Sequence, residues 1–110
     1  GAETWSDISV KEISRTINLA KPGDKIEIDI HDQTKVAKRN DVENLDETFT
    51  VNNEKNEACI KLSRGSKKCF YFFNEVDIIN IEIISGAFTE DERNKLVFEI
   101  AESKKEVKNE

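Results

Sequence analysis

The stretch CFYFFNEVDIINIEII, residues 69–84, decides the expected fold. Its first five residues, Cys69 to Phe73, are all apolar, which predicts a strand that is covered on both faces. Asn74 and Glu75 then break the run, and isoleucines alternate with polar residues as far as Ile83. That alternation is typical of a strand with one buried face, so the stretch predicts two consecutive strands joined by a short kink.

Three more strands are predicted upstream. Residues 25–30 read KIEIDI, with three isoleucines on one face, and residues 58–62 alternate in the same way. A weaker apolar pattern predicts a strand at 47–52, and the sequence RGS at 64–66 is typical of a hairpin turn. Residues 31–41 are polar and mixed in charge, and we expect a loop there.

An N-terminal helix is predicted from a capping-box pattern. Ser9 and Glu12 have the spacing at which each side chain satisfies a free backbone N–H group of the other residue. The pattern predicts a helix over about 9–20, preceded by a flexible segment at 1–8.

A C-terminal helix is predicted in the same way. Thr89 and Glu92 repeat the capping-box spacing, and the acidic first turn suits the helix dipole. In such a helix Phe98 would point away from the apolar face, toward a partner. We expect the charged tail 103–110 to fray.

These elements predict one domain of mainly β (α+β) class. The chain has 110 residues, enough for one hydrophobic core but not for two. The expected architecture is a small, bent, five-stranded antiparallel barrel with an N-terminal and a C-terminal helix. A roll resembling a pleckstrin-homology domain is the nearest competitor, although it would require more strands.

The charge balance narrows the choice of partners. The formal net charge is −6, which argues against binding nucleic acid through a broad basic surface. A small basic group, Arg64, Lys67 and Lys68, surrounds the predicted hairpin turn and is the candidate nucleic-acid contact. No segment approaches the roughly 20 apolar residues that a membrane span requires, so we expect no membrane partner.

The two cysteines are expected to be reduced. If a two-residue turn joins their strands, the pairing parity places Cys59 and Cys69 on opposite faces of the sheet, whereas a three-residue loop would reverse that parity. We favour the first arrangement, in which no bond can form between them. Free thiols predict a cytoplasmic or nuclear protein.

Catalytic and metal-binding patterns are weak. His31 is the single histidine, and no nucleophile-elbow pattern accompanies it. Two cysteines and one histidine without a Cys-x-x-Cys pair cannot make a standard zinc site, and the four glycines form no phosphate-binding cluster. We therefore expect a protein that is not an enzyme and that uses no metal or cofactor.

Residues 70–83, FYFFNEVDIINIEI, resemble the second sequence motif of the Sm and Sm-like (LSm) proteins. The resemblance implies an SH3-like or Sm-like barrel, in which the fourth and fifth strands join neighbouring subunits by edge pairing. The Arg-Gly pair with which that family contacts RNA is replaced by Phe73-Asn74. The chain therefore looks like the divergent, gemin-type members, which use the fold to bind other subunits.

The predicted function follows from this pattern. We expect a non-catalytic protein-interaction subunit or scaffold module of an RNA-processing or ribonucleoprotein assembly complex. Its partners would be other protein subunits in a hetero- or homo-oligomer, with RNA bound only indirectly. A nucleic-acid-binding domain that uses the basic hairpin and a pleckstrin-homology-like binding module are the alternatives. The predicted partner-binding residues are Phe70, Phe72, Phe73, Ile79, Ile81, Ile83 and Phe98.

Overall fold

The computed structural model describes residues 1–105. Two helices and six strands, with two short 3-10 turns, make up this part of the chain. In chain order they are α1 (Ala2–Leu19), β1 (Lys25–Asp29), α2 (His31–Arg39), η1 (Leu45–Thr48), β2 (Phe49–Asn52), β3 (Glu57–Ser63), β4 (Ser66–Tyr71), β5 (Val76–Ile84), η2 (Gly86–Phe88) and β6 (Lys95–Glu102).

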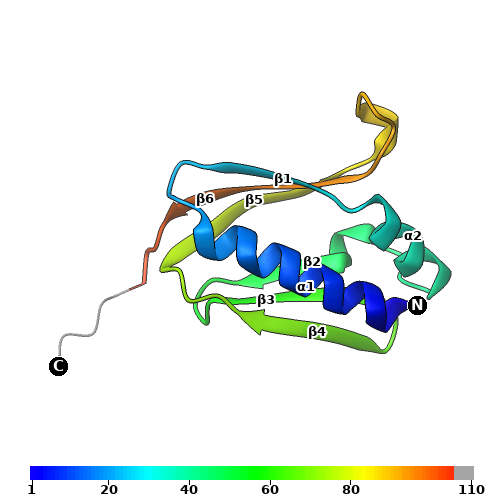
Figure 1. The fold of residues 1–110 in the computed structure, drawn as a ribbon, viewed down its shortest axis with the longest axis horizontal. Helices are drawn as coiled ribbons and strands as arrows, with labels where there is room; N and C mark the ends of the chain where they lie inside the picture. The colour runs from blue at the N-terminus through cyan, green and yellow to red at the C-terminus, as the bar shows by residue number, and fades with distance from the viewer. Residues whose placement is uncertain (106–110) are drawn as a thin grey trace.

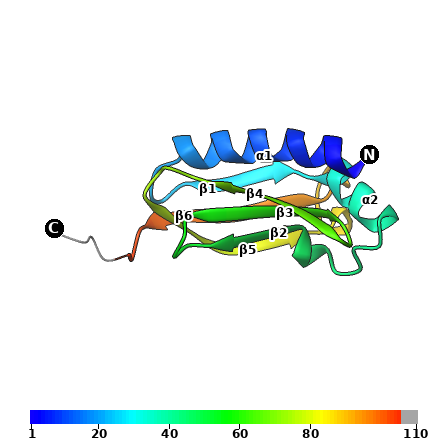
Figure 2. The ribbon, with the colours of Figure 1, turned by 90° about the horizontal axis from the view of Figure 1, so that it is seen from below.

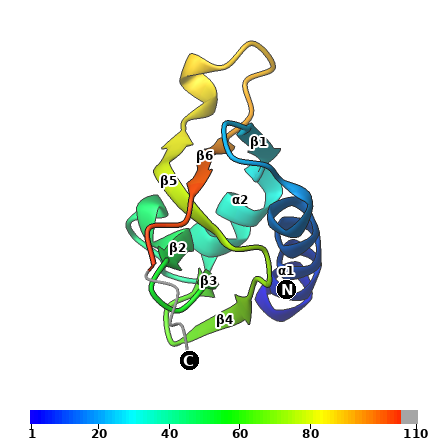
Figure 3. The ribbon, with the colours of Figure 1, turned by 90° about the vertical axis from the view of Figure 1, so that its left-hand side faces the viewer.

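The strands form two antiparallel sheets of three strands each. Sheet A has the order β1–β6–β5, and sheet B is the meander β2–β3–β4. Seen end-on, sheet A lies above sheet B and α1 runs along one side (Figure 3), while α2 lies at one end of the sheets, near the start of α1 (Figure 1). The mixed α and β class is as predicted, but the two sheets do not close into a five-stranded barrel.

The core lies between the inner faces of the two sheets. Alternation along each strand provides one apolar row, because successive side chains point to opposite faces. Ile28 of β1 pairs with Leu96 of β6, which pairs with Ile83 of β5, so three apolar side chains cross sheet A on one face. In sheet B the inward row of β3 is Ala58, Ile60 and Leu62, all at most 3% exposed.

One aromatic pair joins the two sheets. Phe49 begins β2 and Phe98 lies in the middle of β6, and their rings stack with centroids 5.8 Å apart. Phe49 is 4% exposed and Phe98 is fully buried. The two rings therefore lie in the centre of the core and fix how the sheets face each other.

The N-terminal helix begins earlier than predicted. It starts at Ala2 rather than at Ser9, and it covers one side of the molecule along its length (Figure 2). Ser9 is 2% exposed and lies on the inward face of the helix with Ile13 and Ile17. The capping-box prediction was wrong because the segment before Ser9 carries its own apolar contacts, Ala2 and Trp5, which pack against the core.

Two other predictions about secondary structure were wrong. Residues 31–39 form helix α2 rather than a loop, with Val36 and Ala37 buried. Residues 95–102 form strand β6 rather than a helix, so Phe98 points inward and is unavailable to a partner. The tail prediction for 103–110 falls partly outside the described residues. Within it, the Lys104 N–H donates to the Asp77 carboxylate at 3.2 Å.

The cysteines form a disulfide, contrary to the prediction. The turn at Arg64-Gly65 has two residues, because Ser63 pairs with Ser66, but the register of β3 and β4 shifts by one residue between Ile60 and Ser63. This bulge reverses the parity and places Cys59 directly opposite Cys69, with Cα atoms 4.0 Å apart. The expectation of reduced thiols was therefore wrong.

We expect reduction of this disulfide to destabilise the domain measurably. The two cysteines are 10 residues apart. A crosslink that closes a loop of that length lowers the entropy of the unfolded chain, which raises the free energy of unfolding by roughly 2–3 kcal/mol at 25 °C. Urea unfolding with and without dithiothreitol should show a loss of that size in the free energy of unfolding.

The variant Cys69→Ser is the matched control for this experiment. It should show the lower stability without reductant and no further change when dithiothreitol is added. Two free thiols titrated in the unreduced, denatured wild-type protein would contradict the disulfide.

Candidate functional site

The predicted partner-binding residues divide into three groups by burial. Phe72 and Phe98 are at most 2% exposed and belong to the core. Phe70 and Ile83 are half-buried and pack against the core. Phe73 is 79% exposed, and Ile79 and Ile81 are each 38% exposed, so these three side chains remain on the surface.

Two exposed aromatic side chains, the predicted Phe73 and its neighbour Tyr71, lie where β4 ends. Tyr71 is 69% exposed and Phe73 is 79% exposed, while Phe72 between them points into the core. Residues 69–73 were predicted to be buried on both faces, and the structure buries them on one face only. Leu19, at the end of α1, is 75% exposed. We call Leu19, Tyr71 and Phe73 the aromatic strip.

Two asparagines hold the aromatic strip in place. The Asn18 side-chain oxygen accepts hydrogen bonds from the backbone N–H groups of Phe73 and Asn74, at 3.0 and 3.4 Å. The Asn74 amide donates to the carbonyl oxygens of Ile17 and Ala20 at 2.9 and 2.7 Å. The Asn74 bonds add to the C-terminal cap of α1, in which the Ala20 N–H already donates to the Ile17 carbonyl oxygen. All four bonds fasten the crossover from sheet B to sheet A against α1 (Figure 1).

The phenol group of Tyr71 has a partner on the neighbouring strand. Glu57 lies directly opposite Tyr71 in the β3–β4 register. A hydrogen bond to the Glu57 carboxylate, together with its negative charge, raises the pKa of Tyr71. The ring is therefore held on the surface of sheet B by a polar contact.

The predicted strand edges are partly occupied. At the outer edge of β5, the Asn53 side chain bonds both backbone groups of Ile78, accepting from its N–H and donating to its carbonyl oxygen, each at 2.9 Å. Beside β4, Lys68 forms an ion pair with Asp7 of α1. A bulge at Asn80, which has a φ of 54°, also bends β5. These features partly block the edges of β4 and β5, the two strands predicted to pair with other subunits.

The basic hairpin is only partly available for nucleic acid. Lys68 is bound to Asp7, as described above, while Lys67 and Arg64 lie at the β3–β4 turn and are exposed. Neighbouring acidic residues limit the positive potential, since Glu47 forms an ion pair with Lys61 at 3.7 Å. The structure thus brings the three predicted residues to one turn but pairs one of them within the chain.

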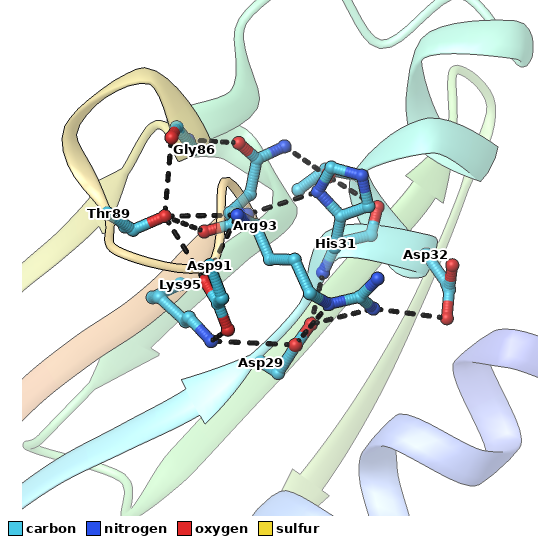
Figure 4. Close-up of polar contacts among 10 residues, drawn as sticks. Asp29, His31, Asp32, Gly86, Thr89, Asp91, Arg93 and Lys95 are labelled. Carbon is cyan, nitrogen blue, oxygen red and sulfur yellow. Dashed lines mark hydrogen bonds and ion pairs between the residues drawn. The ribbon is translucent and has the colours of Figure 1, made fainter.

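A charged cluster lies toward the end of the molecule away from the aromatic strip, where β1, α2 and the 85–94 loop meet (Figure 4). The Arg93 guanidinium binds the Asp29 carboxylate through two hydrogen bonds, at 2.6 and 3.2 Å, and lies 3.5 Å from Asp32. Lys95 binds Asp91 at 2.6 Å and lies 3.5 Å from Asp29. Each of these five charges therefore has a partner within the cluster.

Neutral hydrogen bonds fix the same loop. The Asn94 N–H donates to Nδ1 of His31 at 3.1 Å, and the Asn94 amide donates to the Thr34 hydroxyl at 2.8 Å. The Asn94 side-chain oxygen accepts from the Gly86 N–H at 2.7 Å. Sequence analysis had left His31 without a role, and the structure uses it as an acceptor that anchors the loop to α2.

The pairing changes the acidity of the cluster. The hydrogen bonds from Arg93 lower the pKa of Asp29 to about 2 against the opposing effect of burial, with smaller help from the His31 backbone N–H and from the charges of Arg93 and Lys95. The hydrogen bond to Asp91 raises the pKa of Lys95. The cluster is therefore an ion-pair clamp, which holds the 85–94 loop against β1 and α2.

Similarity to known proteins does not assign a function to this chain. No family model, curated protein or solved structure matches the chain. Among the described residues, neither helix has the length and apolarity that crossing a membrane demands.

We expect Asp29→Asn to remove a stabilisation that depends on pH. Because the pKa of Asp29 is lowered on folding, its contribution is present above about pH 4 and is lost as the pH falls through about 2. The side chain is 39% exposed, so solvent screening limits the effect to roughly 1 kcal/mol at pH 7. Urea unfolding at pH 7 and pH 2.5 measures it.

The stability difference between wild type and Asp29→Asn should therefore shrink at the lower pH. Asp46→Asn is the control, because Asp46 is exposed and has no ion-pair partner among residues 1–105. An equal difference at both pH values would contradict the role of the Asp29 charge.

Proposed function

We propose that this domain is a non-catalytic protein-interaction module that binds a partner protein through the aromatic strip. The observation that carries the proposal is the exposure of Tyr71 and Phe73, at 69% and 79%, where the Phe73 backbone meets Asn18 at the end of α1, next in sequence to the exposed Leu19. Exposed apolar side chains that occur singly are ordinary, whereas neighbouring ones mark interaction surfaces.

The rigidity of the aromatic strip supports this proposal. Asn18 and Asn74 fasten the backbone around Phe73 to α1, and Glu57 holds the Tyr71 phenol. Aromatic side chains that are already ordered lose little conformational entropy on binding, and tyrosine is enriched among the residues that dominate binding energy. A partner would therefore gain the contact area of two rings at a small entropic cost.

The disulfide indicates the kind of cellular compartment in which the domain works. Disulfides persist in oxidising environments and are rare in the cytosol and nucleus. The prediction of a cytoplasmic or nuclear protein depended on reduced thiols, which the Cys59–Cys69 bond replaces. We infer that the domain works in an oxidising compartment. The role in ribonucleoprotein assembly depended on the Sm-like resemblance, and it stays a prediction.

Replacing Phe73 by aspartate should abolish partner capture without unfolding the domain. Phe73 is mostly exposed, so the fold should tolerate a charge there, while losing a dominant interface aromatic costs about 2 kcal/mol or more. We expect at least roughly tenfold less of one or more specific partners on the immobilised variant. The measurement is quantitative mass spectrometry of the proteins retained from an extract of the source cells.

Phe88→Asp provides a matched control, since Phe88 is an equally exposed phenylalanine at the other end of the molecule. It should leave the partners that depend on Phe73 bound. Sedimentation of the purified domain distinguishes self-association, because a dimer that Phe73→Asp dissociates would make the partner a second copy. Capture that is unchanged by Phe73→Asp, in a protein with the wild-type circular dichroism spectrum, would refute the proposal.

A further inference from the structure

The outer face of sheet A carries a hollow of about 340 Å³ beneath the 85–94 loop. Glu27, Ile84 and Lys95, one from each strand of the sheet, form its floor. Phe88 and Glu90 of the loop form a wall (the loop stands at the upper right in Figure 1). The hollow therefore combines apolar, aromatic and acidic side chains in one place.

Phe88 is held in solvent by a rigid loop. It is 85% exposed, the highest value among the large apolar side chains of residues 1–105. The Phe88 N–H donates to the Ser85 carbonyl oxygen at 2.9 Å, and the Thr89 hydroxyl accepts from the Arg93 N–H at 3.0 Å. A side chain on Gly86 would overlap the Glu92 carbonyl group, so the loop closes tightly on itself.

The exposed position of the Phe88 ring does not stabilise the fold. Burying a phenylalanine ring stabilises a fold, and the domain does not gain that stabilisation at Phe88. The ion-pair clamp of Arg93 on Asp29 and Asp32 fixes the loop that presents the ring. An ordered, exposed aromatic side chain is the kind of group that dominates a binding interface.

The charges of the hollow define what can occupy it. Asp91 is neutralised by Lys95 at 2.6 Å. Across residues 1–105, by contrast, no cation lies within ion-pair distance of Glu27 or Glu90. Two unpaired carboxylates beside an aromatic ring attract a cation, because the carboxylates carry negative charge and the quadrupole of the neutral ring makes the potential over its face negative.

We propose that this hollow binds a lysine or arginine side chain of a second partner protein. The aliphatic stem of that side chain would lie against Ile84 and Phe88, and its cationic group would lie between Glu27 and Glu90. This proposal does not depend on the aromatic strip, which lies toward the other end of the molecule (Figure 1). With both surfaces occupied, the domain would hold two partners at once.

A short peptide tests the proposal directly. The probe is the acetylated and amidated pentapeptide Gly-Leu-Arg-Leu-Gly, and its control has citrulline, which is neutral and nearly isosteric, in place of arginine. In a ¹H–¹⁵N titration we expect shifts confined to Glu27, residues 84–91 and Lys95. The citrulline peptide should bind at least about fivefold more weakly, since it lacks the charge.

Variants of the protein separate this site from general charge attraction. Glu27→Gln and Glu90→Gln should each weaken binding of the arginine peptide about three- to tenfold, and Phe88→Ala by a similar factor. Glu54→Gln is the matched control, because it removes the same charge from an exposed turn outside the hollow. It should change the affinity by less than about twofold.

Four results would overturn the proposal. They are no shifts at residues 84–91 at millimolar peptide, equal binding of the citrulline peptide, an equal effect of Glu54→Gln and Glu90→Gln, and shifts at 84–91 that follow protein concentration without peptide. The last result would make a second copy of the chain the occupant. Phe73→Asp should leave peptide binding unchanged, so failure of this site and failure of the aromatic strip are separately visible.

Discussion

The stacked rings of Phe49 and Phe98 are the contact on which the arrangement of the domain depends. Each sheet has three strands and one apolar face, and a single sheet of that size would leave that face in water. The two rings, 5.8 Å apart, lie where the inner faces meet, and α1 and α2 cover the sides that the sheets leave open. Because the sheets are joined through side chains rather than by a continuous ladder, their outer faces remain free for other contacts.

The sequence predicts those strands that alternate clearly. The isoleucines of β1, the alternating row of β3 and the weaker apolar pattern of β2 lie where period-two alternation places them. In β6, Leu96, Phe98 and Ile100 also alternate, but the capping-box pattern at Thr89 predicts a helix there. That threonine serves the loop instead: its hydroxyl bonds the Arg93 backbone. The same local pattern can cap a helix or close a loop. Tertiary packing determines which of the two forms, and a single sequence does not show that packing.

Surface features were harder to predict than strands. Aromatic content at 69–73 indicated an interaction surface, but only the fold reveals that Phe72 points inward while Tyr71 and Phe73 point outward. The disulfide was missed because one bulge residue reverses the parity of a hairpin, and no residue between Ile60 and Ser63 signals a bulge by type. Phe88 gave no signal at all, since its exposure results from ion pairs between residues more than sixty positions apart.

The order of strands in sheet A has a consequence for how the chain acquires its structure during synthesis. The meander of sheet B can pair as soon as it is made, because its strands follow one another. In sheet A, β6 lies between β1 and β5 and is the last strand of the described chain to be made. Neither neighbour has a ladder partner in that sheet until it arrives. A nascent chain therefore carries β1 without a ladder partner while residues 30–94 are made, and β5 joins it in that state until β6 follows, so the core face of sheet A waits for a strand that enters from its C-terminal side.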